Sequence, residues 1–255
     1  MRYYLLTFFI LTCLAPVFAE EKRQTRLGIT FGASYYGYRE ETDIALNRKL
    51  ATFNFIFDGD VIKNRIRFSF NANIFAGKNK ETEVLSEEDH YFSFKQRAST
   101  FIKFSLDNSV EYNLWGPEKF PGYLGGGLRA DVYYNYLKET IYYSTTALFT
   151  LNVRVTQMFI INEKNNLVLS IEIPFFGYGI RPPNFGLQYS HIDLEHKVIS
   201  FHNHFAFYAD LRYQYKFNQL LSLYSILGFE FSHIKFPQLR RDACSRLNIG
   251  LSFSF

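Results

Sequence analysis

Apolar and polar residues alternate along several stretches of the chain, most clearly from Arg65 to Phe75. One set of alternate positions is apolar: Ile66, Phe68, Phe70, Ala72 and Ile74. The positions between them are polar or charged: Arg65, Arg67, Ser69, Asn71 and Asn73. Because successive side chains of a β-strand point to opposite faces, this spacing predicts a strand with one apolar and one polar face.

The same alternation predicts ten strands, with apolar positions that cover 27–35, 51–57, 65–75, 92–104, 124–134, 147–155, 167–175, 205–215, 221–231 and 247–255. Short connections are expected at Asp58-Gly59-Asp60, a tight-turn signal, at Asn162–Asn166 and at Asn218-Gln219. Longer polar segments cover 36–45, 76–90, 137–144, 178–202 and 233–244. Short turns at one end and long loops at the other are typical of barrels that span the bacterial outer membrane.

Residues 107–122 fit this scheme poorly, because they are too many for a short turn and their alternating part is short for a spanning strand. We interpret them as a structured turn with Trp115 near the inner membrane boundary. An extra hairpin, which would make twelve strands, is the alternative.

The N-terminus has the order of a secretory signal peptide. A short basic start is followed by an apolar run to Leu14, by small residues up to Ala19 and by polar Glu20. We therefore expect residues 1–19 to be cleaved and residues 20–255 to form one barrel domain. The apolar run is short for a spanning helix, and no stretch of 18 apolar residues follows it.

Composition agrees with strands that are apolar on one face only. Aromatic residues make up 19% of the chain, yet the mean hydropathy is −0.12. Cys244 is the only cysteine after residue 19, which excludes an intramolecular disulfide in the mature chain. The net charge of +4 gives no argument for a nucleic-acid partner.

The last strand ends on the chain's final residue and has large apolar residues at alternate positions: Leu247, Ile249, Leu251, Phe253 and Phe255. This terminus resembles the C-terminal signal of Gram-negative outer-membrane β-barrel proteins, a resemblance of class that extends in layout over residues 25–255. It implies that these five residues are recognised by the barrel-assembly machinery.

We therefore expect an all-β fold, a transmembrane antiparallel up-and-down barrel of about ten strands, in contact with outer-membrane lipid and with both mature termini in the periplasm. A soluble β-sandwich or lipocalin-like barrel would place the apolar face inside.

The polar face predicts an interior lined by charges: Arg65, Arg67, Arg97, Arg129, Asp131, Arg154, Glu172, Asp210, Arg212, Glu230 and Arg246. These charges could line a channel and make it selective for certain ions. Alternatively, they could pair with one another and fill the interior of a narrow barrel. At ten strands we favour ion pairs, because eight strands are already filled by side chains whereas porin channels need about 16 strands.

The sequence also contains residue types for two further kinds of site, a metal site and a hydrolytic site. His202 and His204, with Asp193 and Glu195 nearby, would share a face if extended, but no metal-ligand spacing appears and we expect no metal or cofactor. Ser190-His191 and Ser232-His233 place hydrolytic residue types together, although neighbours in a strand point apart.

We therefore expect a non-enzymatic barrel with external loops for contacts or narrow passage. The alternatives are an outer-membrane lipid-modifying hydrolase and, third, a small-solute channel.

Overall fold

The computed structural model describes residues 23–40, 44–79, 83–86, 93–94, 99–116, 120–137, 142–181, 195–235 and 239–255. The signal-peptide prediction lies outside these residues. Among the residues described, no helix is long and apolar enough to cross a membrane.

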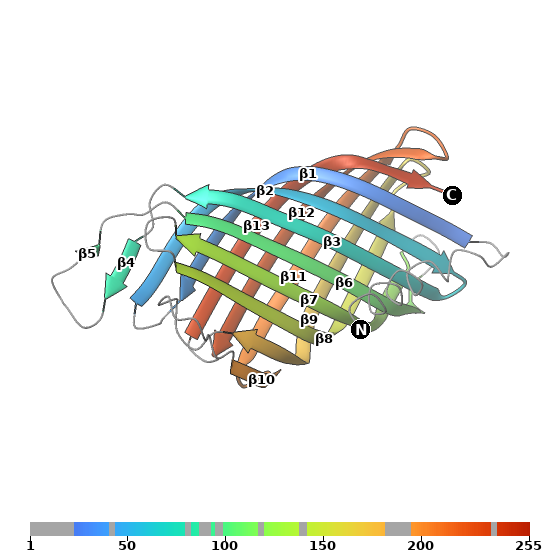
Figure 1. The fold of residues 1–255 in the computed structure, drawn as a ribbon. Helices are drawn as coiled ribbons and strands as arrows, with labels where there is room; N and C mark the ends of the chain where they lie inside the picture. Colours follow the sequence, from blue (N-terminus) through green and yellow to red (C-terminus); the bar gives the residue numbers. More distant parts are fainter. Residues whose placement is uncertain are drawn as a thin grey trace, which may run out of the picture.

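Ten long strands form the wall: β1 (Arg23–Glu40), β2 (Ile44–Lys63), β3 (Ile66–Asn79), β6 (Ser99–Trp115), β7 (Gly122–Leu137), β8 (Tyr142–Ile160), β9 (Asn165–Arg181), β11 (His204–Lys216), β12 (Leu221–Lys235) and β13 (Leu239–Ser254). Each pairs antiparallel with its neighbours, and β1 pairs with both β2 and β13. The sheet is therefore a closed barrel, which confirms the predicted fold and ten strands rather than twelve. Figure 1 shows the strands strongly tilted across the wall.

Three short strands extend this wall: β4 (Glu83–Ser86), β5 (Ser93–Phe94) and β10 (Glu195–Ser200). β4 pairs with the start of β2, and β10 pairs with the end of β9. In Figure 1, β4, β5 and β10 lie away from the C-terminus, where β1 begins. We call the end with Arg23 and Phe255 the terminal end, and the opposite end the far end.

The two faces of the wall are chemically opposite. On β1, Phe31 is 53% exposed on the outer surface, whereas Thr30 is buried inside. On β7, Leu128 is 61% exposed and Arg129 is 8% exposed. The exposed side chains form an apolar belt around the barrel, which includes Ile29, Phe57, Ile74, Val110, Leu151, Leu211, Leu227 and Ile249. This is the reverse of a soluble barrel with an apolar interior.

The first expected turn was wrong. Asp58-Gly59-Asp60 lies inside β2, where Asp58 pairs with Gly28 of β1 and with Asn71 of β3. The chain reverses instead at Asn64, whose φ of 54° is a left-handed conformation that asparagine tolerates better than most residues.

The interpretation of residues 107–122 was also wrong. Asp107 to Trp115 continue β6, which pairs with β3 and β7 up to an irregularity between Asn113 and Trp115. The expected strand over 92–104 is correspondingly shorter at its start, since β6 begins at Ser99 and Ser93–Phe94 belong to β5. Compared with the prediction, β6 is thus shifted toward the terminal end, and its connection to β7 is short.

Strands also replace much of two expected loops. β1 continues to Glu40 and β2 begins at Ile44, within the predicted loop 36–45. Similarly, β12 and β13 leave only residues 236–238 outside the described strands in the segment 233–244. The wall therefore continues toward the far end beyond the alternation that was obvious in the sequence.

Candidate functional site

The inward face holds the chain's main concentration of chemistry. Among the described residues, eight inward cations form ion pairs: Arg26, Arg67, Lys103, Arg129, Arg154, Arg212, Arg240 and Arg246. Nine carboxylates oppose them: Asp58, Asp60, Asp107, Glu111, Asp131, Glu172, Asp210, Glu230 and Asp242. Because the two signs nearly balance, this lining lacks the single-sign field that would select one kind of ion.

These charges are stacked along the barrel axis. On β6, Lys103, Asp107 and Glu111 occupy every second inward position. Lys103 contacts Glu230 and Asp107 contacts Arg154, whereas Glu111 contacts Arg67 and, at 3.6 Å, Arg154 as well. Inward neighbours on a strand are about 6.6 Å apart along the strand, so the groups form successive layers.

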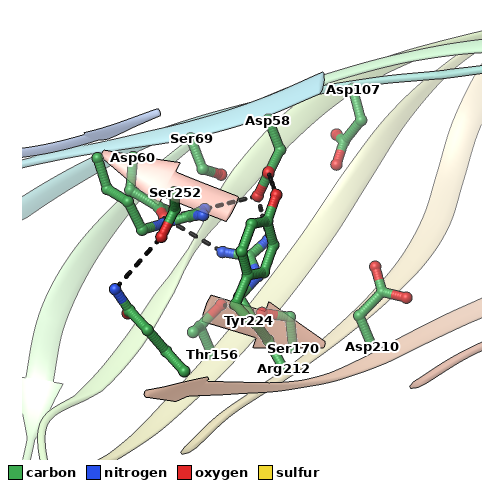
Figure 2. Close-up of polar contacts among 12 residues, drawn as sticks. Asp58, Asp60, Ser69, Asp107, Thr156, Ser170, Asp210, Arg212, Tyr224 and Ser252 are labelled. Carbon is green, nitrogen blue, oxygen red and sulfur yellow. Dashed lines mark hydrogen bonds and ion pairs between the residues drawn. The ribbon is translucent and has the colours of Figure 1, made fainter. Parts of the chain in front are cut away.

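The terminal-end cluster comprises Arg26, Asp58, Asp60, Arg67, Glu111, Arg212 and Tyr224. Asp58 Oδ2 lies 2.5 Å from Arg26 Nη2 and 2.6 Å from Arg212 Nη2. The Tyr224 hydroxyl donates a hydrogen bond of 2.5 Å to Asp58 Oδ1. Figure 2 shows Asp58, Arg212 and Tyr224 converging on one another inside the barrel. Strands from opposite sides of the interior are thereby joined.

Asp60 extends this cluster. Its Oδ2 accepts hydrogen bonds from Arg26 Nε at 2.7 Å and from Arg212 Nη1 at 3.2 Å. Its Oδ1 accepts from Arg67, whose Nη1 in turn lies 3.0 Å from Glu111 Oε1. One carboxylate therefore contacts three guanidinium groups, which leaves each buried cation with a counter-charge.

Gly28 provides the space for this arrangement. A Cβ atom at this position would lie 2.2 Å from the Tyr224 hydroxyl and 2.8 Å from Asp58 Oδ1. No ordinary side chain fits at those distances, so a glycine at this inward position of β1 allows Tyr224 and Asp58 to meet.

The central cluster comprises Asp107, Arg129, Arg154, Glu172, Asp210, Glu230 and Arg246. Arg154 Nη1 lies 2.6 Å from Asp107 Oδ2, and Arg246 Nη2 lies 2.6 Å from Asp210 Oδ1. Glu230 contacts Arg246 and Lys103 and lies 3.6 Å from Arg129 Nη2. Each carboxylate of the central cluster therefore has a cationic partner.

A small cavity lies within the central cluster. Its volume is about 20 Å³, and Asn73, Asp107, Arg154 and Arg246 are among its lining residues. Each of these four carries a buried polar atom without a hydrogen-bond partner. A cavity of this size and polarity holds about one water molecule, which is too little for a continuous aqueous path.

Cations and aromatic rings fill the next layer, toward the far end. The Arg240 guanidinium carbon lies 4.1 Å from the centre of the Tyr133 ring and 5.0 Å from that of Tyr38. Lys103 Nζ lies 5.2 Å from the Tyr133 ring and 5.4 Å from the Phe75 ring. Cation–π contacts of this kind stabilise charges that burial has separated from water. All five of these residues are at most 2% exposed.

The structure places nine of the eleven predicted lumen charges inside, each in an ion pair: Arg67, Arg129, Asp131, Arg154, Glu172, Asp210, Arg212, Glu230 and Arg246. The prediction for Arg65 was wrong, because this residue lies exposed in the turn between β2 and β3. Arg97 lies outside the described residues.

Several interior charges were not predicted from the sequence, among them Arg26, Asp58, Asp60, Lys103 and Asp107. The signal for the aspartates was present, because Phe53, Phe55 and Phe57 already place even-numbered positions of β2 inward. Continuing that alternation through Gly59 would have predicted both Asp58 and Asp60 inside.

Among the residues that the structure describes, the candidate histidines and serines do not assemble into one site. His202 is exposed in a turn and His204, the first residue of β11, is buried inside, so the two share no strand face. His204 Nε2 and Ser232 Oγ are both buried without a hydrogen-bond partner. Ser190-His191 and Asp193 lie outside the described residues.

The predicted assembly-signal residues all point outward on β13 or directly after it. They are between 44% and 70% exposed: Leu247, Ile249, Leu251, Phe253 and Phe255. The backbone of Phe255 still exchanges two hydrogen bonds with Thr25, at 3.1 and 2.8 Å. The final strand therefore presents an apolar outer edge while its backbone helps to close the barrel.

No protein-family model and no curated protein sequence matches the chain. Among solved structures, the outer-membrane protease OmpT of Escherichia coli is similar over 91% of this chain and 97% of its own, with 8% identity and a TM-score of 0.67.

Two further structures align with TM-scores of only 0.39. Neisserial surface protein A aligns over 90% of this chain and 97% of its own at 11% identity. OprG of Pseudomonas aeruginosa aligns over 91% and 95% at 10% identity. At these identities the likeness concerns architecture alone, and by architecture this chain is an outer-membrane-type β-barrel.

Proposed function

We propose that this chain is a non-enzymatic integral protein of the bacterial outer membrane, with a closed interior and a far end that makes contacts outside the cell. The filled interior carries this proposal. Ion-pair clusters and the aromatic layer occupy successive levels, and a cavity within the central cluster has a volume of only about 20 Å³. Such an interior favours contact at the far end over passage through the barrel.

Conductance tests the closed interior. The mature chain, refolded and inserted into a planar bilayer, is expected to give no discrete conductance steps. A 16-stranded porin in the same membrane serves as the positive control, since barrels of that size hold an aqueous channel. Regular steps from this chain would contradict the closed interior and favour the small-solute channel.

Lipid hydrolysis tests the non-enzymatic part. The mature chain in micelles with labelled phospholipid is expected to release no more product than empty micelles do. Hydrolysis that His204→Ala abolishes would favour the lipid-modifying hydrolase, because His204 is a histidine buried on the inward face of β11.

The membrane setting is part of the proposal. The apolar belt suits hydrocarbon, and closure pairs the edges that lipid could not hydrogen-bond. Residues 1–19 would direct export, and both mature termini would face the periplasm.

In a Cys244→Ala background, His202→Cys should react with an impermeant reagent on intact cells, whereas Lys164→Cys in a terminal-end turn should react only after lysis. The opposite result would invert the orientation.

We also propose that the outer edge of β13 is the sorting signal read by the barrel-assembly machinery. Its support is the alternation of exposed apolar residues that ends on Phe255. Phe255→Asp should lower the amount of folded barrel in outer membranes while the signal peptide is still removed. Unchanged assembly of this variant and of Phe253→Asp would contradict the proposal.

A further inference from the structure

Basic side chains line one side of the far end, immediately beyond the apolar belt. Outward alternation on β1 runs from Tyr35 through Gly37 to Arg39, and on β3 from Ala76 to Lys78. At the same level on the adjacent strands β2, β12 and β13, exposed residues that point outward are also basic. We call this set the basic arc: Arg39, Lys49, Lys78, Lys235 and Arg241.

The arc occupies five neighbouring strands, β12, β13, β1, β2 and β3 in ring order. With neighbouring strands about 4.8 Å apart, it extends over roughly 20 Å of the barrel's circumference. In Figure 1, blue β1 and β2 lie along the upper edge of the barrel, where red β13 joins β1. The arc is therefore a continuous surface rather than scattered charges.

The side chains of the basic arc all carry the same sign of charge. Among the described side chains of these five strands, the carboxylates Asp58, Asp60, Glu230 and Asp242 all point inward. The register places Arg39 directly opposite Arg241, and Arg241 directly opposite His233. Arg39 and Arg241 therefore lie side by side on the outer surface, where an anion with several oxygen atoms can contact both.

The opposite wall differs. There the outward residues toward the far end include Tyr134 of β7, Tyr178 of β9 and Val198 of β10, which are 38%, 41% and 55% exposed, and the exposed His196, whose ring lies 6.0 Å from that of Tyr178. Aromatic residues are usual at membrane boundaries. The basic arc thus distinguishes one side of the barrel from the other at the same boundary.

We propose that the basic arc binds the phosphate groups of anionic lipids in the membrane leaflet that surrounds the far end. Lysine and arginine can lay their apolar stems along the belt while their charged ends reach headgroup level. Arginine in addition matches phosphate oxygens with two parallel hydrogen bonds. Placing that leaflet on the outer side rests on the proposed function.

A lipid titration tests the proposal. The probes are dimyristoyl phosphatidic acid and dimyristoyl phosphatidylcholine, which share their acyl chains and differ in headgroup charge. The refolded mature chain in detergent micelles should retain the acidic lipid preferentially, as measured by native mass spectrometry. In Lys78→Gln/Lys235→Gln/Arg241→Gln that preference should weaken about fivefold for each charge removed, or about 125-fold in total.

The control removes three basic residues at the terminal end, in Arg65→Gln/Lys164→Gln/Lys216→Gln, and should keep the preference. An equal affinity of the wild-type chain for both lipids, or an equal loss in both triple variants, would overturn the proposal. Each sample is first run unboiled and boiled on a gel. A chain with no heat-sensitive folded form would overturn the membrane-barrel proposal itself, whereas a folded barrel without lipid preference overturns only the basic arc.

Discussion

The same strands carry two populations of charge that behave differently. On β2, Asp58 and Asp60 point inward and are bound by arginines of other strands, whereas Lys49 points outward in the basic arc. Inside, nearly balanced charges satisfy one another and fill the barrel. Outside, on β12, β13, β1, β2 and β3, the described charges have a single sign. The interior charges therefore have their counter-charges within the barrel, whereas this part of the outer surface is suited to an anionic partner.

The largest expected effect comes from removing a shared counter-charge inside. Asp60→Asn keeps the side chain's size but leaves Arg26, Arg67 and Arg212 with one carboxylate fewer. Because an uncompensated buried charge is costly, the free energy of unfolding in lipid vesicles should fall by about 3–5 kcal/mol. Urea titration followed by unboiled gel mobility measures this.

The double variant Asp60→Asn/Arg67→Gln is the control for that experiment. If the two groups stabilise each other, it should lose less stability than the sum of the single variants. Strict additivity, or an Asp60→Asn barrel as stable as the wild type, would show that the ion pairs do not hold the interior together.

The next largest effect tests the two faces of β3. Phe70 faces the apolar belt and its ring packs 5.3 Å from that of Phe57, whereas Asn71 lines the central cavity. Phe70→Arg would place a charge in hydrocarbon and should cost about 2–4 kcal/mol near the membrane midplane. Asn71→Arg enters a polar interior and should cost less.

Fluorescence then separates lipid from lumen. In a Cys244→Ala background, a fluorophore on Phe70→Cys should be quenched by quenchers carried on lipid chains, whereas one on Asn71→Cys should not. The reverse pattern would mean that the assignment of faces on β3 is inverted.

A smaller effect is expected from filling the space at Gly28. Gly28→Ala would drive a methyl group into the Tyr224 hydroxyl, so stability should fall by about 1–3 kcal/mol. Gly37 on the same strand is the matched control, because a Cβ there meets its nearest atom, the Ala243 carbonyl oxygen, at 3.8 Å. If both alanine variants lose the same stability, the close approach at Gly28 is not the cause.

The faces of the strands could be predicted from sequence because alternation is a local property. Arg67 and Arg129 were placed inside for this reason, without any knowledge of their partners. Asp58 and Asp60 were missed because Asp-Gly-Asp also fits a turn, and the local residues favour neither alternative. Only the pairing with β1 and β3 decides between them.

The interior partners could not be predicted, because barrel closure determines them. Arg212 and Asp60 are 152 positions apart and meet only once β11 and β2 enclose the same space. The basic arc was missed for a similar reason. Its five residues come from strands at both ends of the chain, and β1 joins them only by pairing with β13.

The smallest expected effect is the converse of the first. Lys235 is exposed at the outer end of β12, in the basic arc, and removing its charge leaves no described carboxylate inside without a partner. In vesicles of uncharged phosphatidylcholine, Lys235→Gln should therefore change the free energy of unfolding by no more than about 0.5 kcal/mol. In vesicles that contain phosphatidic acid the same substitution should become destabilising, because a lipid that binds the folded barrel stabilises it by mass action. The matched control Lys164→Gln, in the turn between β8 and β9, should behave alike in both vesicles. A large loss for Lys235→Gln in uncharged lipid would mean that the outer charge is structural after all, and that the contrast between the two populations does not hold on β12.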